Sequence, residues 1–192
     1  MFVTIIGGDH GLQEKDSSGD FRKLIENFID QSPVDVIAEE AKQNYETIPR
    51  QIAGARSIPW LGVDLNLADR KRLKIDDELN NRPWCPIYSD TAHETAHLGD
   101  KRMYLPNADT IREQFWVSRT LESGASTALF ICGFFHLQKV SDKFMAAGCE
   151  VAQVNVCELN WYKRLYGEIK LFTKEDGSLW YESRYVKPTN IY

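Results

Sequence analysis

Two histidines of this sequence close the same short pattern, Gly-x-x-His, and each pattern follows an apolar run. The first pattern begins at Gly7 and ends at His10, and the second begins at Gly133 and ends at His136. A glycine directly after a buried strand lets the backbone turn sharply. Gly7 and Gly133 are therefore expected to aim their histidines back over the ends of two strands.

Three carboxylates follow further apolar runs, namely the adjacent pair Glu39 and Glu40, and Asp64. Neutral imidazoles and carboxylates are the ligands that Zn, Mn, Co and Fe take, and a bound metal lowers the pKa of its water toward about 7. We expect His10, His136, Glu39 and Glu40 as metal ligands, in an order that the pattern does not assign between the two glutamates. Without a metal, a carboxylate or a histidine oriented by one would act as general base toward a water.

Short apolar runs alternate with helical periodicities along most of the chain. The alternation predicts an α/β fold with a mainly parallel sheet flanked by helices, and the ends of parallel strands share one sheet edge. Ligands bind at that edge, where Gly7, Gly133 and Asp64 are expected to line a cofactor site. The strands are expected at residues 2–6, 34–38, 60–63, 127–132 and 149–156, and the helices at 20–29, 68–80, 109–123 and 137–147.

A length of 192 residues favours a single domain, 1–192. Residues 83–107 carry three prolines and few apolar repeats, which predicts an inserted loop, and residues 167–186 alternate as in a β-hairpin added at the C-terminus. Asp20 is placed to cap the first long helix, and Gly148 to end the last. The four cysteines show no metal-binding spacing and are expected as buried thiols in a reducing cytoplasm.

The charge balance and hydropathy exclude several classes of partner. The formal net charge is -5 and the isoelectric point is near 5.4, so the protein repels phosphate backbones and is not expected to bind nucleic acid. The longest apolar stretch, 128–135, is far shorter than the roughly 20 residues that span a bilayer. The N-terminus has no basic leader. We expect a cytoplasmic protein that does not associate with membranes.

The two Gly-x-x-His patterns, the glutamate pair and an arginine-bearing helix together resemble the superfamily that contains TraB-like proteins, Tiki proteases, erythromycin esterases and ChaN-like haem-binding lipoproteins. The similarity covers most of residues 2–156, and its most specific part is the segment Ile131-Cys132-Gly133-Phe134-Phe135-His136-Leu137. The resemblance implies an α/β fold and, in several branches, hydrolysis of amide or ester bonds, with a divalent metal in the Tiki branch.

The resemblance also implies the active-site residues. These would be His10, one of Glu39 and Glu40, and His136, with Arg112 as the helical arginine that holds a substrate carbonyl or orders the carboxylates. A surface arginine paired with a nearby acid is the plainer interpretation of Arg112.

A competing motif lies in the expected loop. His93-Glu94-Thr95-Ala96-His97 matches H-E-x-x-H, which on a helix places two histidines one turn apart to bind zinc. Its flanks lack the apolar stripe of a zinc-protease helix. Three interpretations stay open: a zinc metalloprotease, a loop that lends His93 or His97 to the His10/His136 site, and a chance match.

The residues therefore predict a hydrolase of an amide or ester bond in a small molecule or peptide, activating water at a His/Glu site with a divalent metal. One alternative is a non-catalytic protein that binds haem or a similar ligand through the two histidines. Another is an interaction module, in which the aromatic C-terminal segment forms a partner surface or a homodimer.

Overall fold

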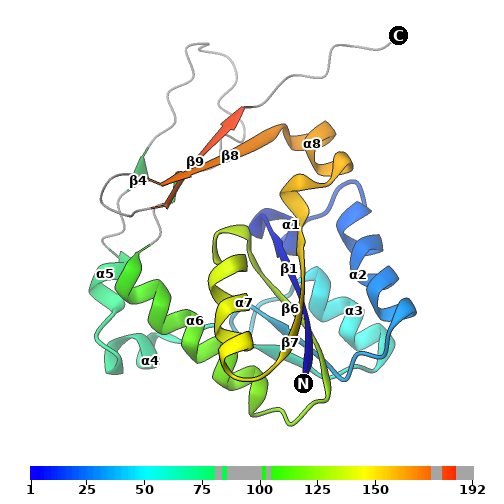
Figure 1. Ribbon diagram of the computed structural model, residues 1–192, viewed down its shortest axis with the longest axis horizontal. Coiled ribbons are helices and arrows are strands. Elements are labelled where there is room, and N and C mark those ends of the chain that lie inside the picture. Colours follow the sequence, from blue (N-terminus) through cyan, green and yellow to red (C-terminus); the bar gives the residue numbers. More distant parts are fainter. Residues whose placement is uncertain (81–83, 86–100, 103–104, 174–178, 185–192) are drawn as a thin grey trace.

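A five-stranded, all-parallel sheet forms the centre of the computed structural model, which describes residues 1–80, 84–85, 101–102, 105–173 and 179–184 (Figure 1). The strand order is β3-β2-β6-β1-β7. The predicted α/β class is confirmed. The strands are β1 (Phe2–Gly8), β2 (Val36–Glu39), β3 (Trp60–Gly62), β6 (Thr127–Gly133) and β7 (Glu150–Asn155).

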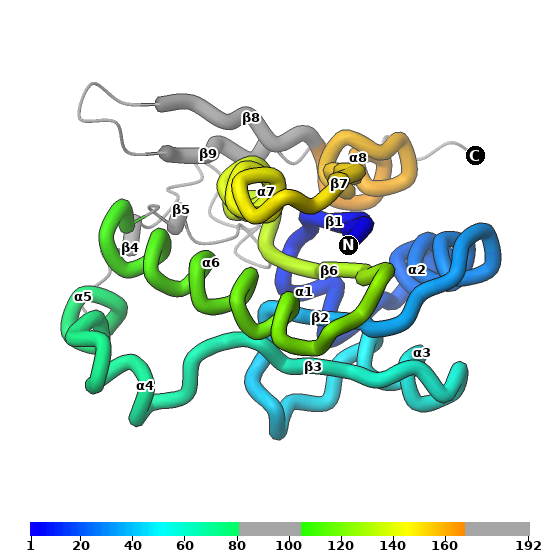
Figure 2. Tube along the Cα trace, turned by 60° about the horizontal axis from the view of Figure 1, so that its bottom comes forward, coloured from blue at the N-terminus to red at the C-terminus, as the bar shows by residue number. Residues whose placement is uncertain are grey.

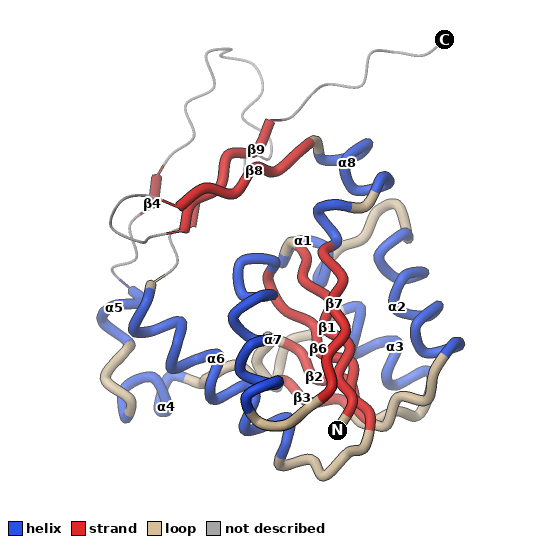
Figure 3. Tube along the Cα trace, in the orientation of Figure 1, coloured by secondary structure: helices blue, strands red, loops and turns tan. Residues whose placement is uncertain are grey.

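Helices cover both faces of this sheet, which explains why its inner strands are apolar on both sides. α6 and α7 lie on one face, while α2 and α3 lie on the other (Figures 2 and 3). Along β6, Phe130 packs toward α6 and α7, and its neighbour Ile131 packs toward α2 and α3. The flanking helices are α1 (His10–Glu14), α2 (Asp20–Gln31), α3 (Ile48–Arg56), α6 (Pro106–Leu121) and α7 (Leu137–Ala146).

The sequence patterns located α2, α6 and α7 but missed α1 and α3. α1 is only five residues long, too short for a periodic pattern, and begins at His10 after the N-cap Asp9, whose carboxylate accepts a hydrogen bond from the Gly11 N–H. Thr47 caps α3 in the same way by accepting from the Arg50 N–H.

Two details of helix termination differ from the expectation. Asp20 does not cap α2: Gly19 occupies the N-cap with φ of 75°, and the carboxylate of Asp16 accepts from the N–H groups of Gly19 and Arg22. The expected helix over 68–80 is two helices, α4 (Leu67–Arg72) and α5 (Asp76–Asn80), because Lys74 adopts φ of 57° between them. Gly148 follows α7 with φ of 82°, as predicted for a helix end.

α6 buries polar as well as apolar residues. Its inward face carries Asp109, Arg112, Glu113 and Trp116, which are buried, whereas the apolar residues Ile111 and Phe115 are only partly buried. The helix starts at Pro106, so Asp109 lies in its first turn and accepts from the Leu105 N–H. The apolar pattern thus located the helix, and Ile111, Phe115 and Leu121 do pack against the core, but from the border of the buried face.

Two strand pairs lie outside the central sheet. After η1 (Phe134–His136), η2 (Val156–Glu158) and α8 (Asn160–Tyr166), β8 (Glu168–Thr173) pairs antiparallel with β9 (Leu179–Arg184), and β4 (Trp84–Cys85) pairs with β5 (Lys101–Arg102). Residues 174–178 lie outside the described residues, so the predicted hairpin connection stays a prediction. So does the structure of most of the expected loop over 83–107.

Cys132, Cys149 and Cys157 are buried free thiols, as expected. None of the helices in the part of the chain that the structure describes combines the length and the apolar character that crossing a membrane requires.

Candidate functional site

The adjacent residues Glu39 and Glu40 point to opposite faces of the sheet, because successive side chains of a strand alternate. Glu39 is the last residue of β2 and faces α3, where its Oε2 accepts hydrogen bonds from the Thr47 hydroxyl (2.6 Å) and the Trp60 indole N–H (2.9 Å). Burial raises the pKa of Glu39 to about 7, although both hydrogen bonds act to lower it.

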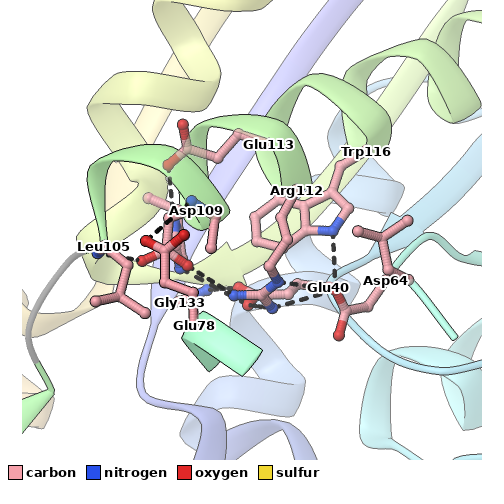
Figure 4. Close-up of polar contacts among 12 residues, drawn as sticks. Glu40, Asp64, Glu78, Leu105, Asp109, Arg112, Glu113, Trp116 and Gly133 are labelled. Atoms are coloured by element: carbon pink, nitrogen blue, oxygen red, sulfur yellow. Dashed lines mark hydrogen bonds and ion pairs between the residues drawn. The ribbon is translucent and has the colours of Figure 1, made fainter. Parts of the chain in front are cut away.

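Glu40 faces α6 and α7 and is the centre of a polar cluster at the carboxyl edge of the sheet (Figure 4). Its Oε1 lies 2.8 Å from an Arg112 guanidinium nitrogen, and its Oε2 accepts from the Gly133 N–H at 2.9 Å. Burial alone would raise its pKa, but the charges of His10, His136 and Arg112 and the Gly133 N–H hold the pKa at about 2. Glu40 is therefore a permanent buried anion.

Arg112 is buried and contacts three carboxylates at once. Besides Glu40, its guanidinium donates to Asp64 Oδ1 (3.2 and 3.1 Å) and to Asp109 Oδ1 (3.0 Å). It also lies over the Trp116 ring, 4.7 Å from the centroid, and the Trp116 indole N–H donates to Asp64 (Figure 4). The plainer interpretation of Arg112 as a surface residue is wrong, because α6 turns this side chain inward.

His10 and His136 approach Glu40 from two sides, yet their environments differ. His10 Nε2 lies 3.5 Å from Glu40 Oε2, and the His10 side chain is 40% exposed. His136 Nε2 lies 3.8 Å from Glu40 Oε1, and the His136 side chain is only 7% exposed. The site thus meets solvent at His10 and is closed at His136.

His136 is fixed by a second carboxylate, which the sequence patterns did not assign to it. Its Nδ1 lies 2.8 Å from Glu113 Oε1, while Glu113 Oε2 accepts from Lys143 Nζ at 2.7 Å. The imidazole also packs edge-on against Trp116. Burial alone would lower the pKa of His136, but Glu40 and Glu113 raise it above the ordinary value.

The glycines of the two Gly-x-x-His patterns allow close packing, and they do so without a left-handed backbone conformation. Neither has a positive φ; Gly133 has φ of −61°. A Cβ on Gly133 would lie 2.8 Å from His10 Nε2, and one on Gly7 would lie 2.9 Å from the Leu137 Cβ. The chain does change direction after β6, where η1 begins at Phe134, and the absence of a side chain on Gly133 leaves room for the His10 imidazole beside Glu40.

The divalent metal expected at His10, His136, Glu39 and Glu40 stays a prediction. Among the described residues, no group of three or more His, Cys, Asp or Glu side chains could hold one. The cation that the structure does place beside Glu40, Asp64 and Asp109 is the Arg112 guanidinium. His93, Glu94 and His97 lie outside the described residues, so their part in any metal site stays a prediction.

The structure thus gathers His10, Glu40, Asp64, Arg112, Gly133 and His136 into one cluster and places Glu39 on the other face. Three residues of the cluster were missed: Asp109, Glu113 and Trp116. With Arg112 they follow the 3.6-residue spacing of one helix face. That spacing was a usable signal, but a charged face on a helix is ordinarily solvated.

Fold and site together define an α/β protein with a buried carboxylate, an arginine and two histidines at the carboxyl edge of its sheet. Comparison of the chain with protein-family models, with curated proteins and with solved structures found no match. The resemblance to the TraB, Tiki, erythromycin esterase and ChaN superfamily stays a prediction.

Proposed function

We propose that the protein is a hydrolase of an amide or ester bond in which His10 acts as general base toward a water. The observation that carries the proposal is the placement of a half-exposed imidazole 3.5 Å from a buried, permanently ionised carboxylate. Such a carboxylate stabilises the imidazolium that forms when the histidine accepts a proton.

Glu40 itself is a poor base. With a pKa of about 2 it has little affinity for a proton, and its two oxygens already accept from Arg112 and Gly133. Its role in the proposal is electrostatic, because a fixed anion inside a low-dielectric site favours positive charge on the neighbouring imidazole.

His136 differs from His10 although both close the same pattern. It is buried between Glu40 and Glu113, and both carboxylates favour its protonated form. We assign it a positioning role: a buried cation that, with Arg112, holds Glu40 in place.

The proposed step balances without a cofactor. With Nε2 of His10 directed at Glu40, a water on the exposed side gives one proton to Nδ1, and its oxygen attacks the substrate carbonyl carbon. The tetrahedral intermediate collapses, the bond to the leaving group breaks, and the imidazolium returns its proton to that group. This step requires no metal, because the protein groups alone accept and return the proton. The haem-binding and zinc-protease alternatives stay predictions.

The test is turnover of p-nitrophenyl esters, lactones and chromogenic peptides by chelator-treated protein. His10→Ala is expected to lower kcat/KM by about 10²- to 10⁴-fold, the usual contribution of a general base, with wild-type thermal stability. The matched control is His93→Ala/His97→Ala, expected to keep wild-type turnover. Activity that chelator abolishes and zinc restores, and that the control variant lacks, would overturn the proposal in favour of the H-E-x-x-H motif.

A further inference from the structure

The two oxygens of Glu40 have different partners. Oε1 lies 2.8 Å from an Arg112 nitrogen and 3.8 Å from His136 Nε2. Oε2 accepts from the Gly133 N–H at 2.9 Å and lies 3.5 Å from His10 Nε2. One oxygen therefore meets two buried basic groups, while the other faces the proposed base. A rotation of the carboxylate would change what His10 faces, so the orientation of Glu40 matters for the proposed reaction.

Arg112 is held on its far side by a carboxylate that binds a second arginine. The Arg112 guanidinium donates to Asp64 Oδ1 at 3.1 Å, and Asp64 Oδ2 accepts from Arg70 at 3.0 Å (Figure 4). We call Arg70, Asp64 and Arg112 the first arm. It runs from α4 to Oε1 of Glu40 and alternates positive and negative groups.

His136 is held in the same way by a second arm, which consists of Lys143, Glu113 and His136. His136 Nδ1 lies 2.8 Å from Glu113 Oε1, and Glu113 Oε2 accepts from Lys143 at 2.7 Å. This arm runs from α7 to the same oxygen of Glu40. In both arms one carboxylate oxygen serves the inner group and the other oxygen serves the outer cation.

The outer cations, Arg70 and Lys143, come from different helices and are only partly exposed, at 21% and 24% of their side chains. Each offsets part of the charge of its carboxylate. Without the outer cation, the full charge of Asp64 or Glu113 would act on the inner group alone. It would draw Arg112 or His136 away from Glu40, and the hold on Oε1 would weaken.

We propose that Arg70 and Lys143 are positioning residues for Glu40: each ends an arm that keeps an inner basic group on Oε1 and so leaves Oε2 for Gly133 and His10. The inference rests on the proposed function, since His10 is the base that this orientation serves. Because both arms hold the same oxygen, either arm partly maintains the orientation when the other is weakened. The two residues should therefore be coupled although they lie in α4 and α7.

The experiment is a double-mutant cycle on turnover. Arg70→Met and Lys143→Met are each expected to lower kcat about threefold with KM nearly unchanged, because a displaced carboxylate affects the reacting atoms at His10. The double variant should lose at least about threefold more than the product of the two single losses. Arg70→Lys and Lys143→Arg keep the charges and should restore turnover to within about twofold of wild type.

The matched control is Arg72→Met/Lys139→Met, which removes two exposed cations from the same two helices and is expected to keep wild-type turnover. Losses that simply multiply in the Arg70→Met/Lys143→Met variant would overturn the proposal, because independent sites are additive. Equal losses in the control would overturn it as well, since they would show an effect of net charge alone.

The Gly133 amide proton gives a readout that does not need turnover, because this N–H donates to Glu40 Oε2. In proton–nitrogen NMR its signal should move upfield in the double variant and stay in place in the control. An unchanged Gly133 signal in the folded double variant overturns the proposal.

The single variants decide the case in which the double variant does not fold. Each should move the Gly133 signal upfield by a smaller amount, and the matching charge-keeping variant should return it; no movement in either overturns the proposal. The upfield shift in a chain that hydrolyses none of the substrates would contradict the proposed function and leave the positioning of Glu40 by the two arms standing.

Discussion

Glu39 and Glu40 are adjacent in the chain and have the same side chain, yet the two faces of the sheet give them opposite properties. On the α3 face, the hydrogen bonds that Glu39 accepts from the described residues come from two neutral donors, and burial raises its pKa to about 7. On the α6 face, Glu40 meets a guanidinium and two imidazoles, and its pKa falls to about 2. Both are buried, so burial alone does not decide the protonation state.

The difference lies in what each helix layer contributes. α6 brings a buried cation, Arg112, to its face of the sheet, whereas the described contacts of Glu39 come from a hydroxyl on the N-cap of α3 and an indole of β3. A buried carboxylate with a charged partner stays ionised, and one with neutral partners takes up a proton more readily. The same substitution at the two positions should therefore have different effects.

The largest effect is expected from removing the negative charge of Glu40. Glu40→Gln leaves Arg112 and His136 without their shared anion and should lower the free energy of unfolding at pH 7 by about 3 kcal/mol or more. Glu39→Gln removes a carboxylate whose ionisation burial opposes, so it should leave the free energy of unfolding at pH 7 unchanged or raise it. Urea denaturation measures both. Equal losses would show that the two faces do not differ as described.

The pH dependence of stability should separate the two glutamates further. Glu39 has a folded pKa above its ordinary value of 4.5, so the folded state binds the extra proton, and its contribution to stability is lost as pH rises from about 4.5 to about 7. Glu40 has a folded pKa below 4.5, so its contribution is lost as pH falls from about 4.5 to about 2.

The contribution of each glutamate to the free energy of unfolding should change by about 3 kcal/mol across its pH range. It is measured as the difference in unfolding free energy between wild type and the matching Glu→Gln variant across pH. A Glu39 difference that grows in favour of wild type with rising pH would contradict the assignment.

The smallest effect on stability is expected from a substitution at Gly133, which should nevertheless lower turnover. Gly133→Ala places a Cβ 2.8 Å from His10 Nε2, and the half-exposed imidazole can move away, so stability should fall by no more than about 1 kcal/mol. Displacing the base should still lower kcat about tenfold or more.

The control is Gly54→Ala in α3, where a Cβ meets nothing within 4 Å. This substitution should raise the free energy of unfolding by about 0.5–1 kcal/mol and keep full turnover. Wild-type turnover in Gly133→Ala would argue against His10 as the base.

The sequence by itself determined the layout of the sheet and the neighbourhood of the site. Apolar runs between helical periodicities are short-range signals, and they located all five parallel strands to within a few residues. Parallel strands bring their carboxyl ends to one edge, so the meeting of His10, Glu40, Asp64 and His136 followed from order alone.

Which partner each side chain meets was decided only by the tertiary structure. The register of β2 fixes which of two adjacent residues faces which helix layer. A register shift of one residue would exchange the faces of Glu39 and Glu40. The inward face of α6 could not be predicted for a similar reason. A charged helix face is expected to be solvated, and Arg112 and Glu113 are buried only because they pair with Glu40 and His136. Ion pairs between residues far apart in sequence leave no local sequence pattern. The pairing of Arg112 with Glu40 therefore follows only from the tertiary structure.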